Sequence, residues 1–340
     1  MATRNLSQIA AAQERAVLRA FTESVQSVKD QAVIAEIVRA LEVGNVDAVV
    51  RLLGLDEARF EPLEEAIRQS YREGGLTGAA QVGRIPTDAG TLVARFNVRN
   101  PRAEQWLVSL SSNRIVEIAE ESRTVVRNVL TANLMEGANP RTAALDLVGR
   151  IDPVTRRRTG GFIGLTTNQA EWVANARRDL ETLNPNYLTR KLRDRRLDAA
   201  FERALATGEP LTAKQIDTAV SRYQARALRY RGENISRTES INALRAGQHE
   251  AIQQAIEVGE IETQDAMKEW DSSGDQRTRD DHFAADGQRV PFDQPFIVGG
   301  EALMFPGDPN GSAGNVINCR CRERTVIDFA GQLKRIEGFR

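Results

Sequence analysis

The sequence predicts a mainly α-helical protein with an elongated helical N-terminal body and a small, loop-rich α+β C-terminal domain. Apolar residues recur every three or four positions over most of the first 257 residues, which is the spacing of an amphipathic helix. After Gly259, turn-rich stretches separated by short strand-like segments replace that pattern. With 340 residues, 41% of them hydrophobic, the chain is long enough for two or three domains with apolar cores. We expect four parts: a helical N-terminal region (1–98), a basic middle region with a long helix (99–231), a C-terminal domain (232–330) and a tail (331–340).

The N-terminal region is predicted to be helical from residue 5 to about 72. Val17, Phe21, Val25 and Val28 mark the apolar face of the first helix. Further helices are expected over 33–41, which Gly44 ends, and over 47–53 and 56–71. The stretch 74–90 holds five glycines and one proline, so it is predicted to be a loop, followed by a strand over 91–98.

Residues 101–136 carry the longest periodic signal and predict one long helix or two nearly collinear helices. A short helix is then expected to end at residue 149, followed by a basic, glycine-containing loop over 156–164. Thr166 or Thr167 is expected to cap the next helix. Helices are predicted over 188–206, 212–231 and 236–257, and short strands over 268–270 and 325–328. Trp270 is expected to anchor the core of the C-terminal domain.

Several classes of protein are excluded by composition. No apolar run approaches the ~18 residues that a membrane span needs. The N-terminal residues lack a continuous apolar segment and include Glu14 and Arg15, so they do not form a secretory signal. Two cysteines in 340 residues indicate synthesis in a reducing compartment. We therefore expect a soluble protein made in the cytoplasm.

Charge is distributed unevenly along a chain whose net charge is −1. Residues 1–140 hold 16 basic and 18 acidic side chains, 141–231 hold 18 and 10, and 232–340 hold 12 and 19. Of the 46 basic residues, 41 are arginine, whose planar fork binds carboxylates and phosphates. The excess of arginine over lysine therefore suits binding to phosphates or to acidic partners. Coding bias in a GC-rich genome would produce the same composition.

The segment 268–322 contains one of the two histidines and both cysteines. Cys319 and Cys321 stand two apart, which places both thiols on one face of an extended chain and disfavours a disulfide between them. The two thiolates, the His282 imidazole and a carboxylate such as Asp281 or Asp275 would make a tetrahedral zinc site. The alternative is that the cysteines are small buried apolar residues and that His282 bonds to a loop backbone.

The same segment, W-D-S-S-G-D-Q-R-T-R-D-D-H followed by D-G and F-P-G-D-P-N-G-S-A-G-N-V-I-N-C-R-C, resembles the C-terminal domain of phage Mu F-like minor head proteins. The upstream S-R-T-E is also typical of that family, so the resemblance covers about residues 232–328. The residues that carry it, called here the motif residues, are Arg237, Glu239, Trp270, Asp275, Arg277, His282, Asp286, Gly287, Pro306, Asp308, Asn318, Cys319, Arg320 and Cys321.

The resemblance implies a minor capsid protein of a tailed bacteriophage. Such a protein is bound to the portal inside the head and assists head morphogenesis, DNA packaging or genome ejection. Its implied partners are the portal protein, the major capsid or scaffolding protein, and packaged DNA, with no membrane. Its implied location is the capsid interior at the portal vertex, and the host cytoplasm during assembly. Some family members are suspected to bind metal through cysteine and histidine side chains. In this sequence, the residues that match such ligands are His282, Cys319 and Cys321.

Two groups of charged side chains are further candidates for contacts. The basic residues of the middle region would bind DNA phosphates or an acidic portal surface, or would form an ordinary solvated face: Arg156, Arg157, Arg158, Arg190, Lys191, Arg193, Arg195 and Arg196. In the C-terminal domain, arginines such as Arg277 and Arg279 either form forks with nearby aspartates that hold the loops, or make a solvated cluster. Asn318 and the Asp286-Gly287 pair are turn formers.

The sequence gives less support to an enzymatic function than to a structural role. Glu260 and Glu262 resemble the acidic pair of ADP-ribosyltransferases, which would make the chain a toxin delivered with the virion, but no Ser-Thr-Ser strand accompanies them. Only two histidines are present and there is no nucleophile elbow. A deaminase needs H-x-E, whereas Phe283 and Ala284 follow His282. We therefore expect no catalytic residues and no enzymatic activity.

Overall fold

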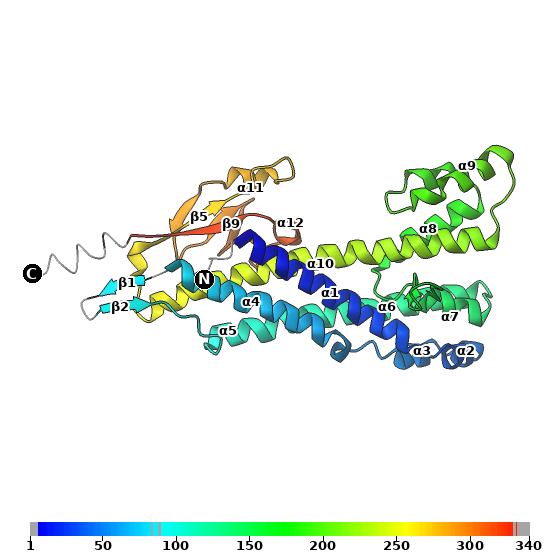
Figure 1. Ribbon diagram of the computed structural model, residues 1–340, viewed down its shortest axis with the longest axis horizontal. Coiled ribbons are helices and arrows are strands. Elements are labelled where there is room, and N and C mark those ends of the chain that lie inside the picture. Colours follow the sequence, from blue (N-terminus) through cyan, green and yellow to red (C-terminus); the bar gives the residue numbers. More distant parts are fainter. Residues whose placement is uncertain (1–5, 83, 88–89, 329–330, 332–340) are drawn as a thin grey trace, which may run out of the picture. The chain divides into compact units, whose positions relative to one another are not determined.

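The computed structural model describes residues 6–82, 84–87, 90–328 and 331, and within them the chain is mainly helical, as predicted (Figure 1). None of the described helices is long and apolar enough to span a membrane. The chain forms two compact units, each assembled from segments far apart in sequence. The first unit comprises Met1–Leu18, Leu63–Asn113 and Asn234–Arg340, and the second comprises Arg19–Pro62 and Arg114–Glu233.

The second unit is built from helices with short connections. It contains the second half of α1 (Leu6–Gln31), most of α6 (Ser112–Met135) and the first part of α10 (Ala213–Glu257). Its other helices are α2 (Ile34–Glu42), α3 (Val46–Leu53), η1 (Glu57–Phe60), α7 (Pro140–Val148), α8 (Thr167–Glu181), η3 (Pro185–Thr189), η4 (Arg195–Leu197) and α9 (Asp198–Thr207). A two-stranded hairpin joins β3 (Arg150–Ile151) to β4 (Arg158–Thr159). Buried residues of α8, η3, α9 and α10, including Tyr187 and Phe201, form one of its cores.

The helix ends of this unit follow the expected capping chemistry. Thr166 caps α8 in a reciprocal arrangement with Gln169, as the sequence predicts for one of the two threonines. Asn139 caps α7 and precedes a proline at the first helical position. Gly54, in the left-handed conformation, ends α3. These local signals are readable in the sequence because each acts within three or four residues.

The first unit combines helices with the C-terminal module, defined here as residues 259–328. Its other elements are the beginning of α1, most of α4 (Glu61–Val82), the hairpin of β1 (Arg84–Thr87) and β2 (Gly90–Val93), α5 (Pro101–Trp106), the π-helical turn η2 (Leu107–Ser111) and the second part of α10. The α5, η2 and α6 segments follow one another without a break, which confirms the long helical signal of 101–136. The predicted strand over 91–98 exists only as β2.

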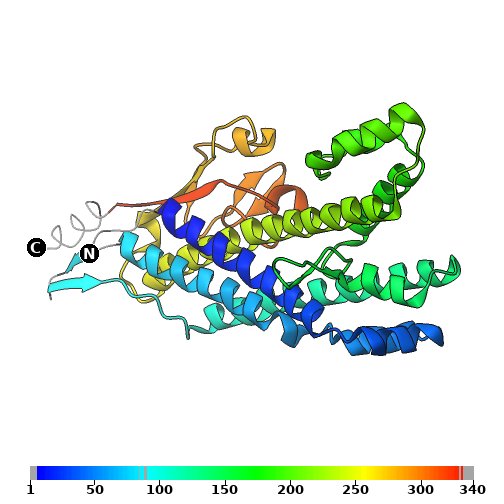
Figure 2. The same ribbon diagram turned by 45° about the vertical axis from the view of Figure 1, so that its right-hand side comes forward.

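The C-terminal module contains two small antiparallel sheets. One has the strand order β6-β5-β9, formed by β6 (Arg289–Pro291), β5 (Ala266–Asp271) and β9 (Arg322–Ile327), and the other pairs β7 (Phe296–Val298) with β8 (Glu301–Leu303). The short elements η5 (Thr263–Asp265), α11 (Asp280–Ala284) and α12 (Ala313–Val316) complete it. Figures 1 and 2 show β5 and β9 lying along α10. Both strands were predicted, although each is longer than expected.

Trp270 is fully buried and lies at the centre of the module, as predicted. Its ring packs edge-on against Phe296 and His282, with centroid distances of 5.4 and 5.6 Å. The same core contains Ala285, Val298, Leu303, Cys319 and Cys321. Burial alternates along β5, so Ala266 and Lys268 face inward together with Trp270.

The predicted loop over 74–90 is wrong for its first half, because α4 continues to Val82. Glycine lowers helix propensity by about 1 kcal/mol, which is why the sequence favours a break. Here the missing side chains let α4 approach α10 closely. A Cβ atom at Gly74 would lie 1.9 Å from the carbonyl oxygen of Leu244, and one at Gly247 would lie 2.0 Å from that of Tyr71. These glycines are therefore contact points between helices rather than turn formers.

Three other helix boundaries differ from prediction. The segments 212–231 and 236–257 form one 45-residue helix, α10, because the single Gly232 does not interrupt it. The predicted helix over 56–71 begins as the 3₁₀ turn η1, with α4 starting only at Glu61. The predicted helix over 188–206 is replaced by η3, η4 and α9, because the side chains of Asn184 and Asp194 accept hydrogen bonds from backbone N–H groups two residues later and so favour short turns.

Asp194 organises the irregular segment between η3 and α9. Its carboxylate, 1% exposed, accepts from three arginines: Arg196 at 2.8 Å, Arg222 at 2.7 Å and Arg226 at 3.1 Å. Hydrogen bonding from Arg196, with further contributions from Arg222 and Arg226, lowers the pKa of Asp194 well below its ordinary value. Because Arg222 and Arg226 belong to α10, this carboxylate fastens the segment to that helix.

We expect Trp270→Ala to lower the free energy of unfolding by about 3–5 kcal/mol, since it removes a large, fully buried side chain. Chemical denaturation followed by circular dichroism measures the change. Trp172→Ala is the matched control, because that side chain is 38% exposed and should contribute much less. If Trp270→Ala unfolds at the same midpoint denaturant concentration as the wild-type protein, the core of the module lies elsewhere.

We expect Asp194→Asn to destabilise the protein by about 1.5–3 kcal/mol at pH 7, the range for hydrogen bonds to charged groups. Since the folded state lowers the pKa of Asp194, its stabilising contribution is complete above the unfolded pKa of about 3.9 and declines as the pH falls below it. The difference between wild type and variant should therefore shrink on acidification in denaturation curves. Asp47→Asn, at an exposed pair with Arg127, should show little difference at any pH.

Candidate functional site

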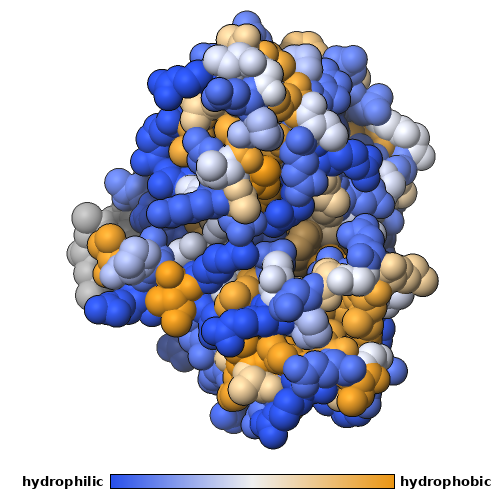
Figure 3. Space-filling model, turned by 90° about the vertical axis from the view of Figure 1, so that its right-hand side faces the viewer, coloured by the Kyte–Doolittle hydropathy of each residue, from blue (hydrophilic) through white to orange (hydrophobic). Residues whose placement is uncertain are grey.

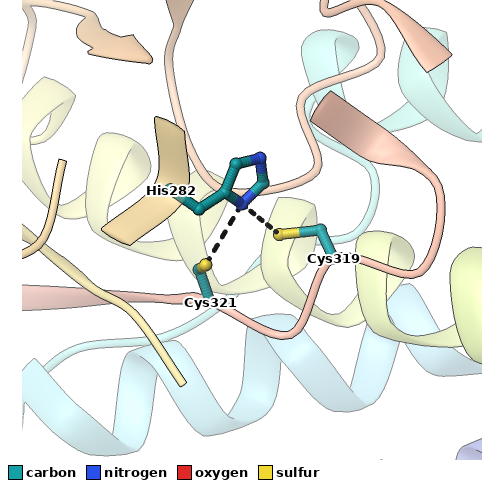
Figure 4. Close-up of side chains that lie close together, drawn as sticks. All are labelled: His282, Cys319 and Cys321. Carbon is teal, nitrogen blue, oxygen red and sulfur yellow. Dashed lines mark hydrogen bonds between the residues drawn. The ribbon is translucent and has the colours of Figure 1, made fainter. Parts of the chain in front are cut away.

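A buried cluster of His282, Cys319 and Cys321, called here the Cys–His cluster, lies in the C-terminal module (Figure 4). His282 belongs to α11, Cys319 follows α12, and Cys321 immediately precedes β9. The Nδ1 atom of His282 is 3.3 Å from the Cys321 sulfur and 3.7 Å from the Cys319 sulfur. All three ligand atoms lie within 4.8 Å of one another.

The backbone around the cysteines is shaped by Asn318, which adopts a left-handed φ of 55°. Asparagine tolerates this conformation better than most residues do. Its backbone N–H donates to the Thr238 hydroxyl at 3.1 Å, and its side-chain amide donates to Asn234 at 3.0 Å. Both partners belong to α10, so the turn that presents Cys319 is attached to that helix.

The imidazole of His282 is oriented by an asparagine that the sequence analysis did not single out. Its Nε2 atom lies 3.1 Å from the Asn315 side-chain oxygen. The amide nitrogen of Asn315 donates in turn to the Val298 carbonyl at 3.4 Å, which fixes which end of the amide faces the histidine. Nε2 therefore carries the proton, and the unprotonated Nδ1 faces the two sulfur atoms.

Arg245 places a positive charge beside the cysteines, although it is a buried residue of α10. Its guanidinium donates to the carbonyl oxygens of Cys319 at 3.3 Å and Pro306 at 3.4 Å. Burial lowers the pKa of Arg245. A hydrogen bond from the Cys321 thiol, together with the positive charge of Arg245, lowers the pKa of Cys319, whereas the same hydrogen bond raises the pKa of Cys321. The site thus favours a thiolate at Cys319, the form of cysteine that binds metals.

The two aspartates considered as a fourth ligand lie apart from the Cys–His cluster. Asp275 forms a two-pronged pair with Arg320, which lowers the pKa of the carboxyl group. Asp281 packs against Gly299. Among the described residues, no further histidine, cysteine, aspartate or glutamate joins the three.

The Asp275–Arg320 pair is the arginine–aspartate fork of this module. Arg277 is nearer to Asp275 in the sequence than Arg320 is, but its guanidinium lies 3.8 Å from that carboxylate and its side chain is 79% exposed. Arg279 donates instead to the carbonyl of Ile317. The fork links the loop after β5 to the residue between the two cysteines, so it holds the position of both.

Other motif residues hold turns through backbone hydrogen bonds. Asp286 accepts from the Ser272 N–H at 2.7 Å, and the N–H of Gly287, at φ 72°, donates to the Trp270 carbonyl at 2.8 Å. Asp308, buried, accepts from the N–H groups of Met304 and Asn310. Pro306 contributes the carbonyl bound by Arg245. These contacts account for aspartates and glycine at these positions without a catalytic role.

Two motif residues lie on α10. Arg237 is 3.4 Å from Glu14 of α1, and Glu239 is buried. On the same helix, His249 pairs with Glu323 of β9 at 2.9 Å and stacks on Phe292. The second half of α10 therefore carries the side chains that attach the module.

Sequence reasoning missed Lys268 as well as Asn315 and Arg245. Lys268 is fully buried on β5 and its ammonium donates to the Met304 carbonyl at 2.6 Å. It also lies over the rings of Phe292 and Phe296, and burial lowers its pKa to about 8. One signal in the sequence could have revealed this burial: Lys268 and Trp270 stand two apart on a strand, so their side chains lie on the same face of the sheet.

The basic residues proposed for DNA or portal contact all lie in the second unit. Arg157 pairs with Asp30, and Arg158 donates to the Gly149 carbonyl. Further along the chain, Arg190, Arg193 and Arg196 pair with Asp179, Asp198 and Asp194. Arg156, Lys191 and Arg195 are exposed and form no ion pair with the described residues. Part of the group thus holds local structure, and three members present their charge to solvent.

The acidic pair Glu260 and Glu262 lies between α10 and β5. Glu262 accepts from Gln264, two residues away. Burial raises the pKa of Glu260.

Comparison with known proteins gives one family. Residues 195–324 match the family model described as phage Mu protein F like protein. The protein YqbB of Bacillus subtilis (strain 168) is 33% identical over 104 residues, which are 29% of this chain and 32% of YqbB. The chain therefore spans about a third of the length of that relative. No solved structure matches. The matched residues contain the Cys–His cluster and all the motif residues, so this part of the chain is similar to the phage Mu protein F like family.

Proposed function

We propose that this chain is a minor head protein of a tailed bacteriophage that binds the portal inside the head. It would assist head morphogenesis, DNA packaging or genome ejection, without enzymatic activity. The observation that carries the proposal is the family match over residues 195–324. The similarity to this family suggests a phage head-associated protein, and attachment to the portal, at the inner face of its vertex, is the step that we add.

The architecture supports a structural role for the motif residues. Asp275, Asp286 and Asp308 bind an arginine or backbone N–H groups. Asn318 and Arg245 attach the loops of the module to α10. Residues used in this way stabilise a particular arrangement of loops, which a component of an assembly needs for a defined binding surface.

The second unit offers features suited to a protein partner. A hollow of about 190 Å³ lies between α8, α9 and α10, lined mainly by Leu180, Tyr187, Leu197, Phe201 and Leu211. Figure 3 shows hydrophobic residues among hydrophilic ones on the side of the molecule where α2, α3 and α7–α9 lie. Exposed hydrophobic residues of this unit include Val33, Val43, Leu52, Val154 and Leu205. The hollow and these exposed apolar side chains are available for contact with a protein partner.

Co-expression with the portal protein encoded by the same phage tests the proposal. We expect a stable complex of fixed stoichiometry, measured by native mass spectrometry after size-exclusion chromatography. The double charge reversal Lys191→Glu/Arg195→Glu should weaken the complex if an acidic portal surface is the binding partner. Arg99→Glu, an exposed position in the first unit, is the matched control. A folded protein that fails to bind the portal would contradict portal attachment and direct attention to the major capsid or scaffolding protein.

Contact with packaged DNA makes a separate, quantitative prediction. If Arg156, Lys191 and Arg195 each bind one phosphate, the slope of log affinity against log salt should be about −2.7, or −0.9 for each contact. Fluorescence anisotropy with a mixed-sequence duplex measures the slope. Replacement of the three residues by glutamine should flatten it. A slope near zero for the wild-type protein would exclude phosphate contacts by this surface.

A further inference from the structure

The Cys–His cluster has the spacing of a metal site. In a tetrahedral zinc centre, bond lengths of about 2.3 Å to sulfur and about 2.0–2.1 Å to nitrogen put neighbouring nitrogen and sulfur ligands about 3.5 Å apart. The two distances from His282 Nδ1 to sulfur, 3.3 and 3.7 Å, lie on either side of that value. Figure 4 shows both sulfur atoms facing the same ring nitrogen. The two thiols are not joined in a disulfide.

The histidine is also oriented as a metal ligand should be. Metal-binding imidazoles almost always donate their other N–H to a fixed oxygen, which sets the tautomer. Asn315 supplies that oxygen at 3.1 Å from Nε2, and the Val298 carbonyl fixes Asn315 in turn.

We propose that His282 Nδ1 and the sulfur atoms of Cys319 and Cys321 bind a zinc ion. Two thiolates and one imidazole suit zinc, which accepts mixed sulfur and nitrogen ligands in tetrahedral geometry. The three side chains supply three of four positions. No further histidine, cysteine, aspartate or glutamate joins them among the described residues, so one position is left for a non-protein ligand such as water.

The proposed ion has a structural consequence that follows from where its ligands lie. His282 is 39 residues from Cys321 in sequence, and α11 is a single short helix of five residues. The module's main apolar core is small, built around Trp270, and small domains often depend on a metal to fix their loops. Zinc would join α11 to the beginning of β9, and through Asn318 and Arg245 to α10.

The test begins with the full-length protein purified under reducing conditions. We expect one zinc ion per chain by inductively coupled plasma mass spectrometry. Exchange with cobalt should give the absorption bands of tetrahedral cobalt and a thiolate-to-cobalt charge-transfer band. Removing the metal with a chelator should lower the melting temperature, since binding to the folded state alone stabilises it.

Variants distinguish ligands from packing residues. Cys319→Ser, Cys321→Ser and His282→Gln should each lose the metal and the charge-transfer band. His282→Cys should retain the metal, since a third sulfur can replace the imidazole. The matched control is His249→Gln, which removes the other histidine of the chain and should leave the metal content unchanged.

Two results would overturn the proposal. The first is a reduced, folded wild-type protein that contains no zinc and gives no charge-transfer band with cobalt. The second is a Cys319→Ala variant with unchanged metal content. Because these measurements use the isolated chain, they are independent of portal binding. Circular dichroism of each variant establishes that it is folded, and the wild-type measurements remain decisive if a variant is not.

Discussion

The burial of Arg245 against two separate loops is the interaction on which the first unit depends. Its guanidinium binds the carbonyls of Pro306 and Cys319, so one side chain of α10 fixes both loops that flank the module's core. A buried arginine is costly unless its donors are satisfied, which makes this arrangement sensitive to any displacement of either loop. The position of the cysteines, and therefore of the Cys–His cluster, follows from it.

The second half of α10 acts as the support of the module for the same reason. Asn234 and Thr238 hold the Asn318 turn, and His249 pairs with Glu323 of β9. On another face, Gly247 allows the close approach of α4. One helix thus meets both the helical part of the first unit and its small sheets. A short module of turns and strands gains a fixed conformation from this helix because its own apolar core is limited.

Local signals predicted much of the structure. Helical periodicity, the Thr166 cap, the β5 and β9 strands and the burial of Trp270 all appear as expected, since each depends on residues within a few positions of one another. The glycines of α4 were misread because their role depends on a helix more than a hundred residues away. The zinc interpretation of the cysteines stays a prediction: the structure brings together His282, Cys319 and Cys321 but not the carboxylate that was expected as the fourth ligand.

The sequence by itself determined the helical character of the chain, the family motif and the chemistry of its candidate ligands. Only the tertiary structure decided which polar and charged side chains contact one another. Arg320, not Arg277, pairs with Asp275, and Asn315, not an aspartate, stands beside His282. Asp194 collects three arginines, two of them from a distant helix. Spacing along the chain specifies periodicity and caps, whereas contacts between distant residues depend on the packing of whole elements.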